Sequence, residues 1–167
     1  MRGSLARSLL ALSVLALTSP ASTVAEERQW ILLDPGPESV SVVYGTPHSD
    51  DVVVGFECAA TTGTLTVSVL SSLSIESDEI AAEMTLASPG GRVMLPARGT
   101  FQMMDELVLF TAETRLDPPL RAVLSGSGML RIAVLADTFE APLAGSEAPL
   151  AGSEAAVAAL SERCGGS

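Results

Sequence analysis

An alternation of apolar and polar residues between positions 40 and 58 constrains the fold of this chain more than any other feature. Spacing of two residues places one set of side chains on a single strand face: Val52, Val54, Phe56 and Cys58. Residues 40–44 alternate in the same way, and residues 45–50 contain Pro, Ser and Asp, which are typical of turns. The pattern predicts an antiparallel hairpin with a six-residue loop. Its register is expected to be well specified, because a slip of one residue would turn Phe56 and Cys58 towards water.

Further segments show strand patterning. The clearest is 64–69, where apolar residues alternate with Thr and Ser, as expected of an antiparallel sheet with one wet face. The other candidates are 28–33, 84–87, 92–95, 106–112 and 129–135. Pro and Gly between 84–87 and 92–95 predict a hairpin turn there. Trp30 is predicted to pack at the edge of the core.

Two helices are predicted. In the first, Asp117 is the N-cap, Pro118 takes the first helical position and Gly126 lies beyond the end. The second runs from Glu154 to about Arg163 and is rich in alanine. The chain is therefore expected to be mainly β, a small antiparallel sandwich or barrel-like meander of about seven or eight strands, with one short helix and a C-terminal helix.

The first 25 residues have the pattern of a signal peptide. Two arginines precede an apolar run over 8–17, and small residues favour cleavage after Ala25 rather than Ala21. The apolar run is short for a bilayer span, so this segment is interpreted as removed. The protein is expected to be periplasmic or secreted, with no membrane span after removal of the signal.

An exact repeat follows the last predicted strand. Residues 140–146 read Glu-Ala-Pro-Leu-Ala-Gly-Ser and are copied in 147–153. A proline in each unit excludes a coiled coil, and the period is too short for a solenoid. The predicted organisation is a signal peptide over 1–25, a β-rich domain over 26–139, a duplicated linker over 140–153 and a helix over 154–167.

Two cysteines in an exported chain predict one disulfide, between Cys58 and Cys164. It would pin the C-terminal helix to the central strand and close a loop of about a hundred residues. The chain contains no C-x-x-C motif, so no thiol redox function is predicted.

The charge is strongly acidic. There are nine Arg, no Lys and twenty Asp and Glu, and loss of Arg2 and Arg7 with the signal leaves seven Arg. Such a surface repels nucleic acid and anionic lipid, so a protein partner, if there is one, is expected to be basic. The simpler interpretation is that the charge keeps the protein soluble.

The loop of the predicted hairpin holds the candidate catalytic or metal-binding residues. His48, Asp50 and Asp51 could supply metal ligands, or a base with an orienting acid. No other His exists to complete a second ligand cluster, so a solvated polar turn is the preferred interpretation. No cofactor, metal or catalytic residue is predicted, and nucleotide-binding and serine-hydrolase motifs are absent from the sequence.

The residues Phe56-Glu57-Cys58, followed by Gly63-Thr64-Leu65-Thr66-Val67, are similar to the start of small secreted barrel-like lysozyme inhibitors. In that family an aromatic-x-Cys strand precedes a G-x-L-x-V strand. The loop motif that such inhibitors insert into their target is not recognisable in this sequence. The resemblance, which covers about a dozen residues, therefore implies a secreted β-rich fold without implying the activity.

The sequence as a whole favours an exported, non-enzymatic binding or interaction protein of the bacterial envelope or secreted space. Two alternatives stay open. One is a small hydrolase or metal-dependent enzyme that uses His48, Asp50 and Asp51. The other is a subunit of an envelope assembly, docked through a sheet edge, or an inhibitor of a basic hydrolase.

Overall fold

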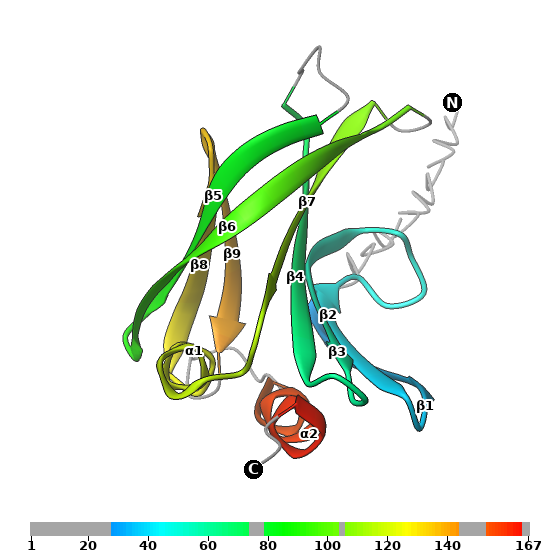
Figure 1. Cartoon of the computed structure of the whole chain (residues 1–167), viewed down its shortest axis with the longest axis vertical. Helices are drawn as coiled ribbons and strands as arrows, with labels where there is room; N and C mark the ends of the chain where they lie inside the picture. Colours follow the sequence, from blue (N-terminus) through cyan, green and yellow to red (C-terminus); the bar gives the residue numbers. More distant parts are fainter. Residues whose placement is uncertain (1–27, 74–78, 104–105, 144–152, 165–167) are drawn as a thin grey trace, which may run out of the picture.

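The computed structural model describes residues 28–73, 79–103, 106–143 and 153–164 (Figure 1). These residues form a mainly β fold with two helices, as predicted. The strands are β1 Gln29–Gly36, β2 Ser39–Gly45, β3 Val52–Ala59, β4 Thr64–Ser71, β5 Glu79–Ser88, β6 Gly91–Gln102, β7 Leu107–Thr114, β8 Gly128–Val134 and β9 Asp137–Leu143. The helices are α1 Pro118–Leu124 and α2 Ser153–Cys164.

All the strands belong to one antiparallel sheet with the order β1-β2-β3-β4-β7-β6-β5-β8-β9. The sheet curls into a half-barrel, so the barrel-like alternative describes it and the two-sheet sandwich does not (Figure 1). At one end the two edge strands approach each other, since the Trp30 indole Nε1 of β1 donates a hydrogen bond to the Pro142 carbonyl of β9 at 2.7 Å. Trp30 is buried there, as predicted.

The concave face of the sheet encloses the core. Its largest fully buried side chains include Phe56, Phe110, Leu65, Met84, Leu86, Leu130 and Ile132. Helix α2 packs against β1, β2 and β3 through a stripe at every fourth residue: Ala156, Leu160 and Cys164. The predicted disulfide between Cys58 and Cys164 is present and joins β3 to the end of α2.

Helix α1 agrees with its predicted signals. The Asp117 side chain accepts a hydrogen bond from the Leu120 N–H at 3.0 Å, which is N-cap geometry. Leu120, Val123 and Leu124 are buried, and the helix packs against β6 and β5. Among the described residues, no helix has the length and apolar character needed to cross a bilayer.

Several boundaries differ from the prediction. Residues 140–143, predicted as the start of the linker, form the second half of β9, where Ala141 and Leu143 are buried. Pro142 is tolerated because β9 is an edge strand. Val52, predicted to face inward, is 38% exposed, because the register shift at Gly45 turns it out of the alternation. The signal peptide and residues 144–152 of the repeat lie outside the described residues.

Candidate functional site

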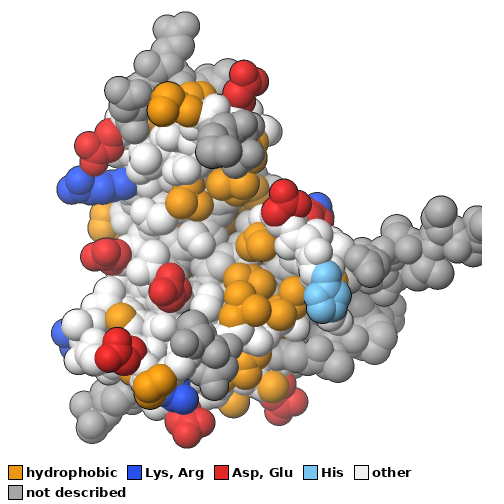
Figure 2. Space-filling model, turned by 90° about the vertical axis from the view of Figure 1, so that its right-hand side faces the viewer, with side chains coloured by type: hydrophobic (Ala, Val, Ile, Leu, Met, Phe, Trp, Pro, Cys, Tyr) orange, Lys and Arg blue, Asp and Glu red, His pale blue; other side chains and the backbone are white. Residues whose placement is uncertain are grey.

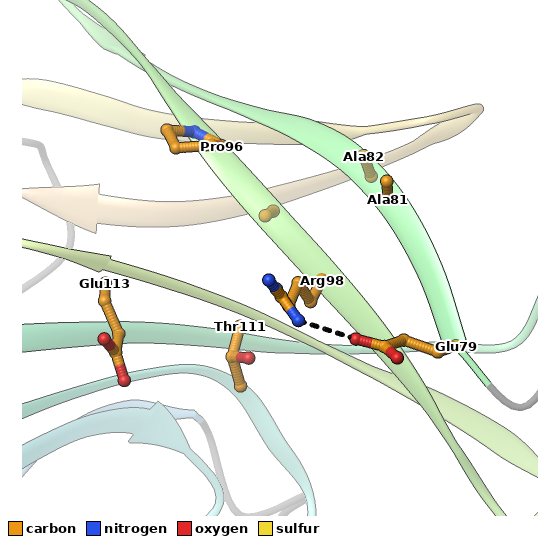
Figure 3. A pocket seen from close by; sticks show the side chains of 8 residues that line it. Glu79, Ala81, Ala82, Pro96, Arg98, Thr111 and Glu113 are labelled. Carbon is orange, nitrogen blue, oxygen red and sulfur yellow. Dashed lines mark hydrogen bonds and ion pairs between the residues drawn. The ribbon is translucent and has the colours of Figure 1, made fainter.

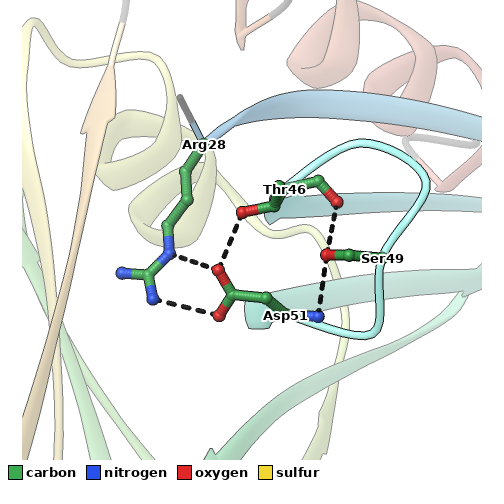
Figure 4. Close-up of polar contacts among 4 residues, drawn as sticks. All are labelled: Arg28, Thr46, Ser49 and Asp51. Atoms are coloured by element: carbon green, nitrogen blue, oxygen red, sulfur yellow. Dashed lines mark hydrogen bonds and ion pairs between the residues drawn. The ribbon is translucent and has the colours of Figure 1, made fainter. Parts of the chain in front are cut away.

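The predicted site residues His48, Asp50 and Asp51 lie in the exposed loop between β2 and β3. His48 adopts a positive φ of 59°, which is a turn conformation. The Ser49 hydroxyl donates to the Thr46 carbonyl at 3.0 Å and accepts from the Asp51 N–H at 3.1 Å (Figure 4). Short-range hydrogen bonds of this kind fix the shape of the loop.

The Asp51 carboxylate is held by an arginine and a hydroxyl. Arg28 Nε and Nη2 donate to its two oxygens at 2.9 and 3.0 Å, and Thr46 Oγ1 lies 2.8 Å from Oδ2 (Figure 4). The Arg28 hydrogen bonds, followed by the Thr46 one, lower the pKa of Asp51 below its ordinary value. The Asp51 hydrogen bond in turn raises the pKa of Arg28. Asp51 would have to break these contacts to act as a metal ligand or a base.

The loop therefore brings the predicted residues into one short segment without arranging them as a metal site. No group of three His, Cys, Asp or Glu side chains with metal-binding geometry occurs in the part of the chain that the structure describes. The structure instead uses Asp51 to tie the start of β1 to the hairpin, over a sequence separation of 23 residues.

A different surface stands out on the convex side of the sheet. Five neighbouring strands each place an apolar side chain outward at the end away from α2: Ile31, Val43, Val53, Leu70 and Leu109. We call these five residues the outer apolar face. Four of these residues form two direct cross-strand pairs, Ile31 with Val43 and Leu70 with Leu109. Figure 2 shows hydrophobic side chains gathered beside the histidine of the loop.

The outer apolar face is partly exposed and slightly hollowed. All five side chains have intermediate burial, and Val52 beside them is 38% exposed. A shallow depression of about 100 Å³ is lined by Val52, Val53, Ser68, Val69, Leu70 and Leu109. Gly55 has no side chain, so the sheet surface is lower at this position. A Cβ there would come within 2.7 Å of the Ser68 hydroxyl.

The same face becomes polar and acidic towards α2. Four residues from Val53, Leu70 and Leu109 along their strands, beyond a row of Gly55, Ser68 and Thr111, there is a further outward row across β3, β4 and β7: Glu57, Thr66 and Glu113. Both carboxylates are exposed, and neither has an ion-pair partner within the described ranges. The convex side therefore joins an apolar half to an acidic half.

A larger hollow opens where β6 leaves β7 (Figure 3). The two strands pair only over residues 98–102 of β6. The preceding residues of β6, 91–97, pair with β5 and not with β7. The hollow measures about 970 Å³ and is lined by Glu79, Ala81, Ala82, Pro96, Ala97, Arg98, Thr111 and Glu113. Pro96 has no N–H to donate, which suits a strand that has separated from its neighbour.

The charges in this hollow are exposed. Arg98 Nη1 lies 2.8 Å from Glu79 Oε1, with side chains that are 77% and 65% exposed (Figure 3). An ion pair that exposed contributes little to stability. Glu113, at the acidic half of the convex side, lines the opposite wall. The hollow is wide and polar, so it does not resemble the enclosed apolar pocket of a typical small-molecule site.

Sequence reasoning did not identify either surface. The outward residues of β3 lie in the run Val52-Val53-Val54, which reads as uniformly apolar, and no local signal tells which valine faces water. The separation of β6 from β7 depends on long-range pairing. Pro96 is the one local signal for it, because a proline has no N–H to donate and therefore indicates an edge or a strand end.

Comparisons with protein-family models, with curated proteins and with solved structures found no match to this chain.

Proposed function

We propose that this chain is an exported interaction protein that binds a protein partner through its outer apolar face. One observation supports this function above the others: five consecutive strands of the sheet carry partly exposed apolar side chains on the convex side. Ile31 and Val43 lie in one cross-strand row, and Leu70 and Leu109 lie in the neighbouring row. The outward face of an antiparallel sheet is ordinarily polar where it meets only water. Contiguous apolar surface with a polar rim is typical of a protein-binding site.

The charge around the outer apolar face defines the partner. Glu57 and Glu113 border it on one side, and the whole chain has a formal net charge of −11. A complementary partner has an apolar centre with Arg or Lys at one rim, and opposite charge would speed its association. A basic secreted hydrolase would meet this description, and so would a basic subunit of an envelope assembly.

The enzyme alternative has weaker support. Asp51, one of its three residues, is engaged by Arg28 and Thr46. His48 lies in an exposed turn whose hydrogen bonds are local. Neither observation describes a nucleophile and base held in a cleft.

The test is site-specific photocrosslinking in the organism that makes the protein. A photoreactive residue at Leu109 is expected to give one discrete protein adduct, and the added change Leu70→Thr should abolish it. Thr keeps strand propensity, so the fold should survive this substitution. Met94 provides the matched control, because it is an apolar strand residue, 55% exposed, outside the outer apolar face.

The outcome separates the possibilities. A Leu109 adduct that persists in the Leu70→Thr variant, or an identical adduct from Met94, would contradict docking through this face. Loss of the adduct in Leu70→Thr and its retention in Met94→Thr would support it. The mass and charge of the crosslinked protein would then distinguish a basic hydrolase from an assembly subunit.

A further inference from the structure

The arginines of this acidic protein are distributed unevenly. The described residues contain seven, and three of them form ion pairs, namely Arg28 with Asp51, Arg98 with Glu79 and Arg131 with Glu140. Four have no carboxylate partner among the described residues. Three of those four, Arg115, Arg121 and Arg163, line the same hollow.

This basic hollow lies where three distant segments meet. The turn between β3 and β4 contributes Ala60, Thr62 and Gly63. The connection after β7 contributes 115–117, and α1 contributes Pro118 and Arg121. The end of α2 contributes Arg163 and Cys164. Its volume is about 510 Å³, and it is open and polar like the hollow beside β6, so the case for a ligand rests on its charge and not on its size.

The electrostatics of the basic hollow favour an anion. Asp117 is the one carboxylate in its lining, and that carboxylate accepts the Leu120 N–H as the N-cap of α1. Three guanidinium groups around one such carboxylate leave a local excess of positive charge. Glu38, which follows Pro37, and Glu162, which precedes Arg163, adjoin the hollow and reduce this excess. Acidic groups beyond the screening length, about 8 Å at physiological ionic strength, oppose it only weakly.

Two of the three guanidinium groups are oriented by hydrogen bonds to backbone carbonyls and have further N–H donors available. Arg163 Nη1 donates to the Pro37 carbonyl at 3.1 Å, and Arg121 Nη2 donates to the Leu116 carbonyl at 3.4 Å. Each guanidinium has five N–H donors, so these contacts use only a part of them. The remaining donors of each guanidinium can make paired hydrogen bonds to two oxygens of one anion.

We propose that the basic hollow binds a small molecule through a phosphate or sulfate group. A tetrahedral oxyanion with two negative charges matches several guanidinium groups, whereas a single carboxylate would leave most of the positive charge uncompensated. The site is separate from the outer apolar face, since its residues come from the ends of the strands beside α1 and α2.

The disulfide is part of this site. Arg163 directly precedes Cys164, which is bonded to Cys58 of β3, so the bond holds the third arginine beside Arg115, which follows β7, and Arg121 of α1. Reduction is expected to weaken oxyanion binding by releasing Arg163, while Arg115 and Arg121 stay on their elements.

The experiment is a titration of the oxidised protein with inorganic phosphate, and separately with sulfate, followed by NMR of the arginine Nε–Hε signals. Chloride keeps the ionic strength constant. The signals of Arg115, Arg121 and Arg163 should shift together and saturate. The variant Arg121→Gln should bind at least about tenfold more weakly, which corresponds to about 1.4 kcal/mol. Gln is a good helix former, so α1 should persist in this variant.

Arg92→Gln is the matched control, because Arg92 is exposed, has no ion pair within the described residues and does not line the basic hollow. Equal weakening by Arg92→Gln and Arg121→Gln, unchanged affinity in Arg121→Gln, or shifts that never saturate would each overturn the proposal. Saturable binding of one anion in preference to the other would support it and identify the ligand as a phosphate or a sulfate compound.

Discussion

Removal of the disulfide should cost this protein a large share of its stability. Cys58 and Cys164 are separated by 106 residues, and both are buried. In the chain-entropy treatment a closed loop of about 100 residues stabilises the folded state by about 4.7 kcal/mol. Domains of this size typically unfold with about 5 to 15 kcal/mol, so the bond is worth a third or more of the total. Helix α2 also buries Ala156 and Leu160, and this packing is a contribution separate from that of the bond.

The perturbation is the double variant Cys58→Ala/Cys164→Ala, which leaves no unpaired thiol. Guanidinium denaturation should show a loss of about 4 to 5 kcal/mol in the free energy of unfolding, and the melting temperature should fall by about 20 °C. Leu160→Ala is the comparison, because it weakens the packing of α2 while the covalent bond stays. A loss below about 1 kcal/mol in the double variant, with an unchanged denaturant slope, would refute the reasoning.

Two further predictions follow from single side chains. Gly99→Ala should destabilise by about 1 to 3 kcal/mol in thermal unfolding, because a Cβ there would lie 2.6 Å from the Phe110 ring; stability equal to wild type would show that the core can make room. Asp51 has a lowered pKa, so its pairing stabilises the fold above the ordinary Asp value of about 3.9 and is lost as the pH falls through the folded-state value. NMR titration of its carboxyl carbon should show a rise in pKa on Thr46→Ala, and an unchanged value would contradict the role given to that hydroxyl.

The local patterns predicted the elements well and their arrangement only in part. Alternation identified β2, β3 and β4, and the Asp117 and Pro118 signals located α1, because these features depend on neighbouring residues. The order β4-β7-β6-β5-β8 depends on pairing between segments far apart in sequence, which no local pattern records. β9 was missed because its residues Glu140–Leu143 belong to a repeat whose proline suggested a linker.

The disulfide was predictable because only one pairing of two cysteines exists, and the export predicted from the first 25 residues favours the bond. The candidate surfaces were not predictable in the same way. Arg115, Arg121 and Arg163 are ordinary charged residues in sequence, and only the placement of α2 beside α1 makes them one site. The loop with His48 contains chemically versatile residue types, yet its hydrogen bonds are structural.

The two proposed surfaces occupy opposite ends of the sheet, and this separation has a consequence. Arg163 of the basic hollow sits at the end of α2, where the disulfide fixes it, whereas Leu70 and Leu109 of the outer apolar face lie at the end away from that helix. Reduction should therefore weaken oxyanion binding while leaving the crosslink at Leu109 intact, provided that the half-barrel stays folded. Helix α2 packs mainly against β1, β2, β3 and β9, whereas Leu70 and Leu109 lie on β4 and β7, so the crosslink at Leu109 does not depend on direct packing by the helix.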